Sequence, residues 1–294
     1  MDKNIFNHQN DEYLLKCIVA QRQEYRQAKK ANNVKSIVTV IFAAFTVLSS
    51  ALDNDILTAI TCLFAIVLLI VSQRIDSYTL KKRRHAASIQ QYVDVELFST
   101  VAEQDATNWG TLPSKTDLAE SISSIDTSET ELAKNWYSNY SKLPPIKQIF
   151  YCQKENIRWD SKLRSEFRVL LIIVYSVILA ALVVITFAIN PSLVRFICVF
   201  SWFLPIIDYC YSFGSNRAQD TRRFERLKED SENIEKLLQN DDFRENYIEL
   251  IELQNKIKDN RENAALIPDW FYKQRKEKHQ SAEDKIAEEL QKSG

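Results

Sequence analysis

Seven residues in the polar parts of the chain have side chains that suit a nucleotide ligand. Aromatic rings stack on nucleobases, and cationic side chains bind phosphates through charge and hydrogen bonds. The seven candidates are Trp109, Trp136, Arg158, Trp159, Trp270, Tyr272 and Lys273. Most aromatic residues in short helical segments pack in a core, so a ligand role applies to a few of them at most. Their spacing does not decide between a core and a ligand pocket.

The sequence offers little for catalysis or for a metal. Three glycines are too few for a phosphate-binding glycine loop. His8, His85 and His279 lie far apart, and the five cysteines form no C-x-x-C pair. The carboxylates alternate with Lys and Arg, which is typical of solvated helix faces. We therefore predict that the protein is not an enzyme and has no metal site and no cofactor. The net charge of −1 predicts no direct binding of DNA or RNA.

Four apolar stretches must position these polar parts. Val169 to Ile189 is an uncharged run of about twenty residues, which at about 1.5 Å per residue crosses a hydrocarbon core of about 30 Å. A second run, Ser192 to Phe213, follows directly after Asn190-Pro191. A shorter pair, Val34 to Leu52 and Ile56 to Ser72, flanks a turn of three residues. The sequence predicts an all-α integral membrane protein with two transmembrane helical hairpins, hence four spans.

Basic residues set the orientation of these spans. Lys and Arg gather before the first and third spans and after the second and fourth, as is typical of cytoplasmic flanks. The turn at Asp53 to Asp55 has neither. Arg195, near the second turn, is the exception. Both termini are therefore expected in the cytoplasm. The predicted segments are an amphipathic cytoplasmic helix (1–33), hairpin 1 (34–72), a cytoplasmic helical insert (73–167), hairpin 2 (168–213) and charged C-terminal cytoplasmic helices (214–294).

Polar residues inside the spans have two interpretations. Thr39, Thr46 and Ser50 share one face of the first span, where small and hydroxyl side chains allow close helix packing. The same face could instead line a water-filled pore in an assembly. Asp208 is the most unusual intramembrane residue, because a carboxylate in the bilayer is costly. An interfacial position is one explanation for it, and a role at the pore mouth is the other.

Local signals predict where several helices begin. Asn10 is expected to cap the first amphipathic helix. Two capping boxes, Ser114 with Asp117 and Ser128 with Glu131, predict short helices in the central insert.

Two helices are expected to continue from the membrane into the polar regions. Leu80 to Phe98 extends the second span and carries Ile89, Val93 and Leu97 on one face. A further helix should begin at Ile146 and run into the third span. In the C-terminal region an intermittent apolar stripe predicts a helical hairpin or a short coiled coil extending from the membrane.

A set of motifs in a fixed order resembles one known family. They are Ala20 to Tyr25, Ala87 to Phe98, Trp109-Gly110 with Pro113, Asn135-Trp136-Tyr137, Tyr151 to Asn156 with Arg158-Trp159-Asp160 and Leu163-Arg164, and Ile267 to Tyr272. Together they resemble the SMODS-associated four-transmembrane pore-forming effectors of bacteria, over nearly the whole chain.

The resemblance implies a role in anti-phage defence of the cyclic-oligonucleotide signalling type. In such a system an associated nucleotidyltransferase makes a cyclic oligonucleotide, and the effector then permeabilises the inner membrane. The expected partners are the lipid bilayer, further copies of the chain in a homo-oligomer, and that cyclic oligonucleotide. The alternative is a membrane-anchored scaffold or sensor that recruits a cytoplasmic partner. The family supplies no agreed ligand residues, so the candidates above come from chemistry alone.

Overall fold

The chain is helical wherever the structure describes it. The computed structural model describes residues 4–51, 55–189, 219–239 and 247–293, and no strand occurs in these ranges. The α-helices are α1 (Ile5–His8), α2 (Glu12–Ala51), α3 (Asp55–Ala102), α4 (Lys115–Ser123), α5 (Pro145–Ile189), a helix at residues 219–238, α7 (Ile248–Asn263) and α8 (Asp269–Ser293). Three 3₁₀ helices, Ala106–Trp109, Thr127–Glu129 and Glu131–Ala133, lie in the central insert. The predicted all-α class is confirmed.

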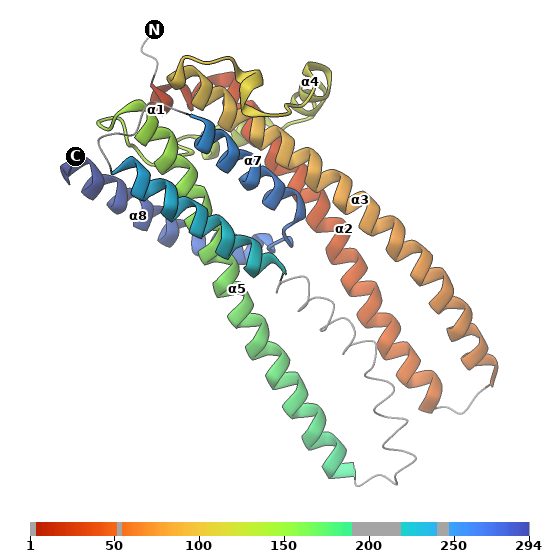
Figure 1. Ribbon diagram of the computed structural model, residues 1–294. Coiled ribbons are helices and arrows are strands. Elements are labelled where there is room, and N and C mark those ends of the chain that lie inside the picture. Colours follow the sequence, from red (N-terminus) through yellow and green to blue (C-terminus); the bar gives the residue numbers. More distant parts are fainter. Residues whose placement is uncertain (1–3, 52–54, 190–218, 240–246, 294) are drawn as a thin grey trace.

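The described helices form a compact head with long arms (Figure 1). α1, α4, α7 and α8 gather at one end of the molecule, and α2, α3 and α5 continue well beyond them. We call residues 34–51 of α2, 55–72 of α3 and 169–189 of α5 the arms. Each of these three helices passes from the head into its arm without a break. The helix expected from Ile146 is present, begins one residue earlier, at Pro145, and continues without a break through the apolar stretch 169–189.

The arms expose apolar side chains to their surroundings. Ile41 of α2, Leu63 of α3 and Val177 of α5 are 63%, 66% and 63% exposed. The other arm residues whose side chains the structure describes are exposed or partly exposed, apart from Thr61. A water-soluble protein seldom exposes such a surface, whereas lipid solvates it. Among the described residues one helical stretch, Ala59–Ala102 within α3, is long and apolar enough to cross a membrane. Residues 190–218, which include the predicted fourth span, lie outside the described ranges.

The head is built on the face of α3 that the sequence indicated. Ile89, Val93 and Leu97 are all buried there, with Leu14 and Ile18 of α2 in the same apolar cluster. α2 and α3 pack along each other, and α7 packs against both α3 and α5.

The C-terminal helices belong to this core as well. Leu227 and Ile234 of helix 219–238 and Leu253 of α7 are buried in the same cluster. Helix 219–238 and α7 lie antiparallel, since Arg223 contacts the carbonyl oxygen of Asn263 and Lys256 pairs with Asp230, which agrees with the expected helical hairpin. The difference is its place, because this pair belongs to the head and is not a separate element that extends from the membrane. Their apolar stripe packs within the head, because burying it there removes more apolar surface from water than pairing two isolated helices would.

One of the two predicted capping boxes is present. Ser114 caps α4, and its Oγ accepts a hydrogen bond from the backbone N–H of Asp117 at 3.1 Å. The second box is wrong. The 3₁₀ helix Thr127–Glu129 is capped by Asp126, whose Oδ1 accepts from the N–H of Ser128 at 2.9 Å. A carboxylate two residues earlier thus takes the capping role predicted for Ser128.

Asn10 does not cap α2 as expected. Its side-chain oxygen accepts a hydrogen bond from the N–H of Asn135 at 2.9 Å, and its amide nitrogen donates to Asn135 Oδ1 at 3.1 Å. Asn10 therefore fastens the start of α2 to a residue far away in sequence. Asn135 has φ +54°, a left-handed conformation that asparagine tolerates better than most residues.

Candidate functional site

Four cations occupy consecutive turns of α2 at the base of the head. Arg22, Arg26, Lys29 and Lys30 are spaced by four, three and one residues, so they share one side of the helix. Val34, the first exposed apolar residue of the arm, comes one turn later. We call these four residues the basic strip. It ends where the exposed apolar part of the same helix begins.

A segment of the central insert lies across the basic strip. Glu129 binds the Arg26 guanidinium through two hydrogen bonds, one of them from Nη1 to Oε1 at 2.8 Å. Arg22 Nη1 donates to the carbonyl oxygen of Leu132 at 3.0 Å. The Arg22 guanidinium also lies 5.7 Å from the ring centroid of Trp136, a cation–π distance. We call residues 124–136 the strap; besides these cations it contacts the head through buried Ala133 and through the hydrogen bonds between Asn135 and Asn10.

The start of α8 supplies the partners of a third cation. Lys29 Nζ lies 2.5 Å from Asp269 Oδ1 and 5.9 Å from the ring centroid of Tyr272. Tyr272 in turn packs against Trp159 of α5, with ring centroids 5.1 Å apart. The basic strip is therefore bordered by aromatic rings on two sides, one from the strap and the others from α8 and α5.

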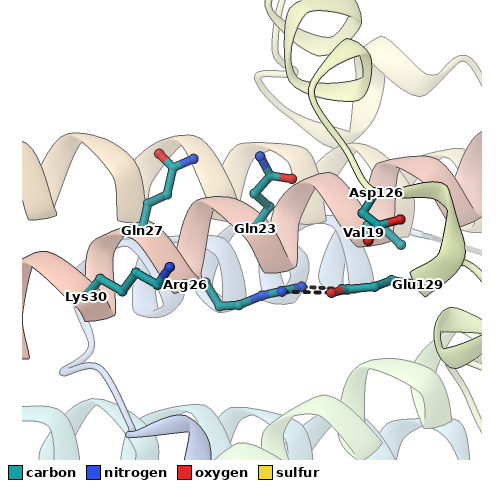
Figure 2. A pocket seen from close by; sticks show the side chains of 7 residues that line it. All are labelled: Val19, Gln23, Arg26, Gln27, Lys30, Asp126 and Glu129. Atoms are coloured by element: carbon teal, nitrogen blue, oxygen red, sulfur yellow. Dashed lines mark hydrogen bonds and ion pairs between the residues drawn. The ribbon is translucent and has the colours of Figure 1, made fainter.

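A cleft of about 250 Å³ opens between α2 and the strap (Figure 2). Its walls are polar apart from one valine, and Figure 2 shows Arg26 and Glu129 meeting across it with Lys30 close by. The lining residues are Val19, Gln23, Arg26, Gln27, Lys30, Asp126 and Glu129. This volume is just below the usual range for small-molecule pockets, and it suits a phosphate-bearing part of a larger ligand.

Both members of the central ion pair are charged at neutral pH. The hydrogen bonds from Arg26 lower the pKa of Glu129, and the Glu129 carboxylate raises the pKa of Arg26. The pKa of Asp126 is lowered too, by its hydrogen bonds with Ser128. An anionic ligand must therefore displace the Glu129 carboxylate from Arg26 while the Asp126 carboxylate remains in the same cleft.

Trp136 carries a buried donor without a hydrogen-bond partner among the described residues. Within the part of the chain that the structure describes, its indole N–H makes no hydrogen bond. An unpaired buried donor costs about 1–3 kcal/mol, so such groups are normally bonded to a protein group, to ordered water or to a ligand. A donor next to Arg22 suits an anionic or carbonyl acceptor.

Three of the seven predicted ligand residues border the basic strip. Trp136 contacts Arg22, Tyr272 contacts Lys29, and Trp159 lies behind Tyr272. The structure thus brings together aromatic residues that are far apart in sequence.

The other four predicted ligand residues lie elsewhere. Trp109 is fully buried in the core against Phe98, with centroids 5.9 Å apart. Arg158 binds the carboxylate of Glu283, with Nη2 to Oε2 at 2.5 Å. The last two are Trp270, which is 58% exposed at the start of α8, and the exposed Lys273.

The predicted pore or packing face is described at one position. Thr39 Oγ1 donates to the carbonyl oxygen of Lys35 at 2.9 Å, within α2. The side chains of Thr46 and Ser50 and the whole of Asp208 lie outside the described residues. A packing role and a pore role for this face both stay predictions.

A buried polar network of the head has no counterpart among the predicted sites. Asp94 of α3 is fully buried and accepts hydrogen bonds from Tyr137 Oη at 2.7 Å, Gln254 Nε2 at 3.0 Å and Arg261 Nη1 at 2.6 Å. It ties α3, α7 and the loop before α5 together. Reading all carboxylates as solvated is therefore wrong for Asp94, because its partners come from distant parts of the chain.

Glu155 is a second buried carboxylate. It accepts hydrogen bonds from the Ser138 N–H at 3.2 Å and from Tyr140 Oη at 3.1 Å. Burial, and next the nearby charge of Glu283, raise the pKa of Glu155 to about 7. Neither network includes a group of three or more metal ligands, and none was found among the described residues.

Comparison with known proteins assigns the chain to a family. A family model described as the SMODS-associating 4TM effector domain matches residues 3–290. No curated protein and no solved structure matches the chain. The motif-based resemblance is thereby confirmed. The chain belongs to the family of SMODS-associating 4TM effectors, which are membrane effectors associated with SMODS-type defence systems.

Proposed function

We propose that this protein permeabilises the bacterial inner membrane when an anionic nucleotide binds the basic strip. The supporting observation is the continuity of α2. One unbroken helix, Glu12–Ala51, carries both the strip and an exposed apolar arm. Arg26 lies about 12 Å along the helix axis from Val34. A ligand that repositions the strip therefore acts directly on an element of the membrane region.

The chemistry of the strip favours a phosphodiester ligand. A guanidinium binds two phosphate oxygens as it binds a carboxylate, so a phosphate can replace Glu129 on Arg26. Lys30 adds charge in the same cleft, and the Trp136 and Tyr272 rings can stack on bases. We infer that the ligand is a cyclic oligonucleotide made by an associated nucleotidyltransferase. Binding breaks no covalent bond, which agrees with an effector that is not an enzyme.

In this proposal the strap holds the inactive packing. Glu129 and the carbonyl of Leu132 satisfy the cations in the absence of ligand. A ligand shifts the equilibrium only if it binds the rearranged packing more tightly than the resting one. Four spans are too few to enclose a wide pore, so permeabilisation requires a homo-oligomer. Both termini face the cytoplasm, where the nucleotide is made.

Dye release from liposomes tests this function. The purified protein, reconstituted in vesicles, is expected to release dye when one member of a panel of cyclic di- and trinucleotides is added. In the Arg26→Ala variant, release should be the same with and without nucleotide, and nucleotide binding should fall at least tenfold. Lys16→Ala is the matched control, because Lys16 is a cation of the same helix that pairs locally with Glu12. It should behave as the wild type.

The same experiment separates the alternative function. A scaffold or sensor would bind nucleotide without releasing dye at any protein density. Nucleotide binding without release would therefore reject permeabilisation, and wild-type binding by Arg26→Ala would reject the basic strip as the site.

A further inference from the structure

A second polar cavity lies at the border between the head and the arms. It has a volume of about 220 Å³ and opens between α5 and helix 219–238. The two helices run antiparallel here, since Arg168 contacts Thr221 and Lys154 contacts Glu235. The cavity shares no lining residue with the cleft at the basic strip.

The cavity sits at the level expected for lipid headgroups. Arg168 is its lining residue nearest the arm of α5, and the next residue, Val169, is already 52% exposed as part of the apolar arm. Phe167, one residue before, is buried in the head. A bilayer that solvates the arms therefore places its headgroups beside Arg168.

Two cations in the cavity retain capacity to bind a further anion. Arg168 donates from Nη1 to Thr221 Oγ1 at 3.0 Å, and its side chain is otherwise exposed. Lys228 is exposed, and its Nζ lies 3.8 Å from an exposed carboxylate of Glu232. A guanidinium has five donors and an ammonium three, so each can donate a further hydrogen bond to a phosphate oxygen.

The wall behind these cations is fixed by contacts within the protein. Arg164 donates to the carbonyl oxygen of Ala265, pairs with Asp160 at 3.1 Å and covers the ring of Phe224 at 5.2 Å. Asp220 is buried and is bound by Arg223 and by the N–H of Ala265. The one buried carboxylate of the cavity is thus already neutralised by the protein.

We propose that this cavity binds the phosphate of an anionic phospholipid of the cytoplasmic leaflet, through Arg168 and Lys228. Basic pockets at the cytoplasmic ends of membrane helices bind such headgroups. The lipid would fasten helix 219–238 to α5 at the membrane surface. This proposal depends on the membrane location of the arms, and it does not require that the protein form a pore.

Lipid retention in nanodiscs tests the proposal. The full-length protein is reconstituted in phosphatidylcholine with a minor share of phosphatidylglycerol, and co-purifying lipid is measured by native mass spectrometry. We expect selective retention of phosphatidylglycerol. Arg168→Ala and Lys228→Ala should each weaken retention about fivefold, and together about thirtyfold. Arg168→Lys with Lys228→Arg keeps the charges and should stay within a few fold of the wild type.

Matched controls remove charge from the same helices outside the cavity. Lys162→Ala on α5 and Arg226→Ala on helix 219–238 should retain lipid as the wild type does, since neither residue lines the cavity. Equal retention of phosphatidylcholine and phosphatidylglycerol, or wild-type retention by the double alanine variant, would overturn the proposal. So would displacement of the lipid by millimolar glycerol 3-phosphate or inorganic phosphate, because a free phosphate would then be the natural occupant.

Discussion

Replacing Asp94 with asparagine should weaken the head more than any other single change of charge. Asp94 has no exposed surface, and the Arg261 side chain that pairs with it at 2.6 Å is 8% exposed. Asparagine can still accept from Tyr137 Oη, but it leaves the Arg261 guanidinium buried without a counter-charge. Breaking a buried pair in this way costs about 3–5 kcal/mol. At about 2–4 °C per kcal/mol, the melting temperature should fall by roughly 6–20 °C.

The assay is thermal unfolding of the detergent-solubilised protein, followed by circular dichroism. Asp76→Asn is the control on the same helix, because Asp76 pairs with Lys35 at 2.6 Å but is 57% exposed. An exposed pair contributes at most about 1 kcal/mol, so this control should shift the melting temperature by less than about 4 °C.

A double variant tests the reason for the loss. Asp94→Asn combined with Arg261→Gln removes both charges and keeps polar groups of similar size. It should be more stable than Asp94→Asn alone, because no unpaired charge then remains in the head. If Asp94→Asn melts like the wild type, or if the double variant is the less stable one, the buried charge is not what makes Asp94 important.

Three further predictions concern other parts of the head. Glu155→Gln should abolish a pH dependence of stability. Because the pKa of Glu155 is raised from 4.5 to about 7, its protonated form contributes up to about 3 kcal/mol, which is fully present below pH 4.5 and lost as the pH rises through 7. Denaturation at pH 5 and at pH 8 measures this difference. Gly110→Ala should destabilise by about 1–3 kcal/mol in the same assay, because Gly110 has φ +110° and an added Cβ would lie 2.3 Å from Asn255 Oδ1; an unchanged midpoint would contradict this. Glu129→Gln should lower the nucleotide concentration for half-maximal dye release about fivefold, because the ligand no longer displaces a carboxylate from Arg26; an unchanged or higher concentration would count against the strap as the resting-state contact.

The sequence predicted those features that depend on neighbouring residues. Helical periodicity identified the buried face of α3 at Ile89 and Val93, and the spacing of Ser114 and Asp117 predicted the start of α4. These signals are local, because a helix repeats its contacts every three or four residues and a cap acts within one turn. The four cations of the basic strip follow the same spacing and could have been recognised from it.

Contacts between distant segments could not be predicted in this way. Asn10 is of a residue type that often caps helices, and yet its partner is Asn135, which is 125 residues away. Asp94 was expected on a solvated face, because charged residues are usually exposed, and its burial depends on Arg261 from a helix 167 residues later. The sequence contains each member of such a pair but gives no sign that they meet.

The strength of the strap limits what the activating ligand can be. The Arg26–Glu129 pair is partly exposed, with side chains 42% and 27% accessible, so its loss changes the equilibrium by about 1 kcal/mol or about fivefold. Moving a population from 1:99 to 99:1 requires a difference of about 5.5 kcal/mol between the two packings. One phosphate on Arg26 is therefore insufficient. A ligand with several phosphates and bases can in addition bind Lys30, satisfy the indole N–H of Trp136 and stack on Tyr272, and their combined contributions reach the required range. We therefore expect a mononucleotide to occupy the cleft without opening the membrane, and dye release by a mononucleotide at saturating concentration would refute this reasoning.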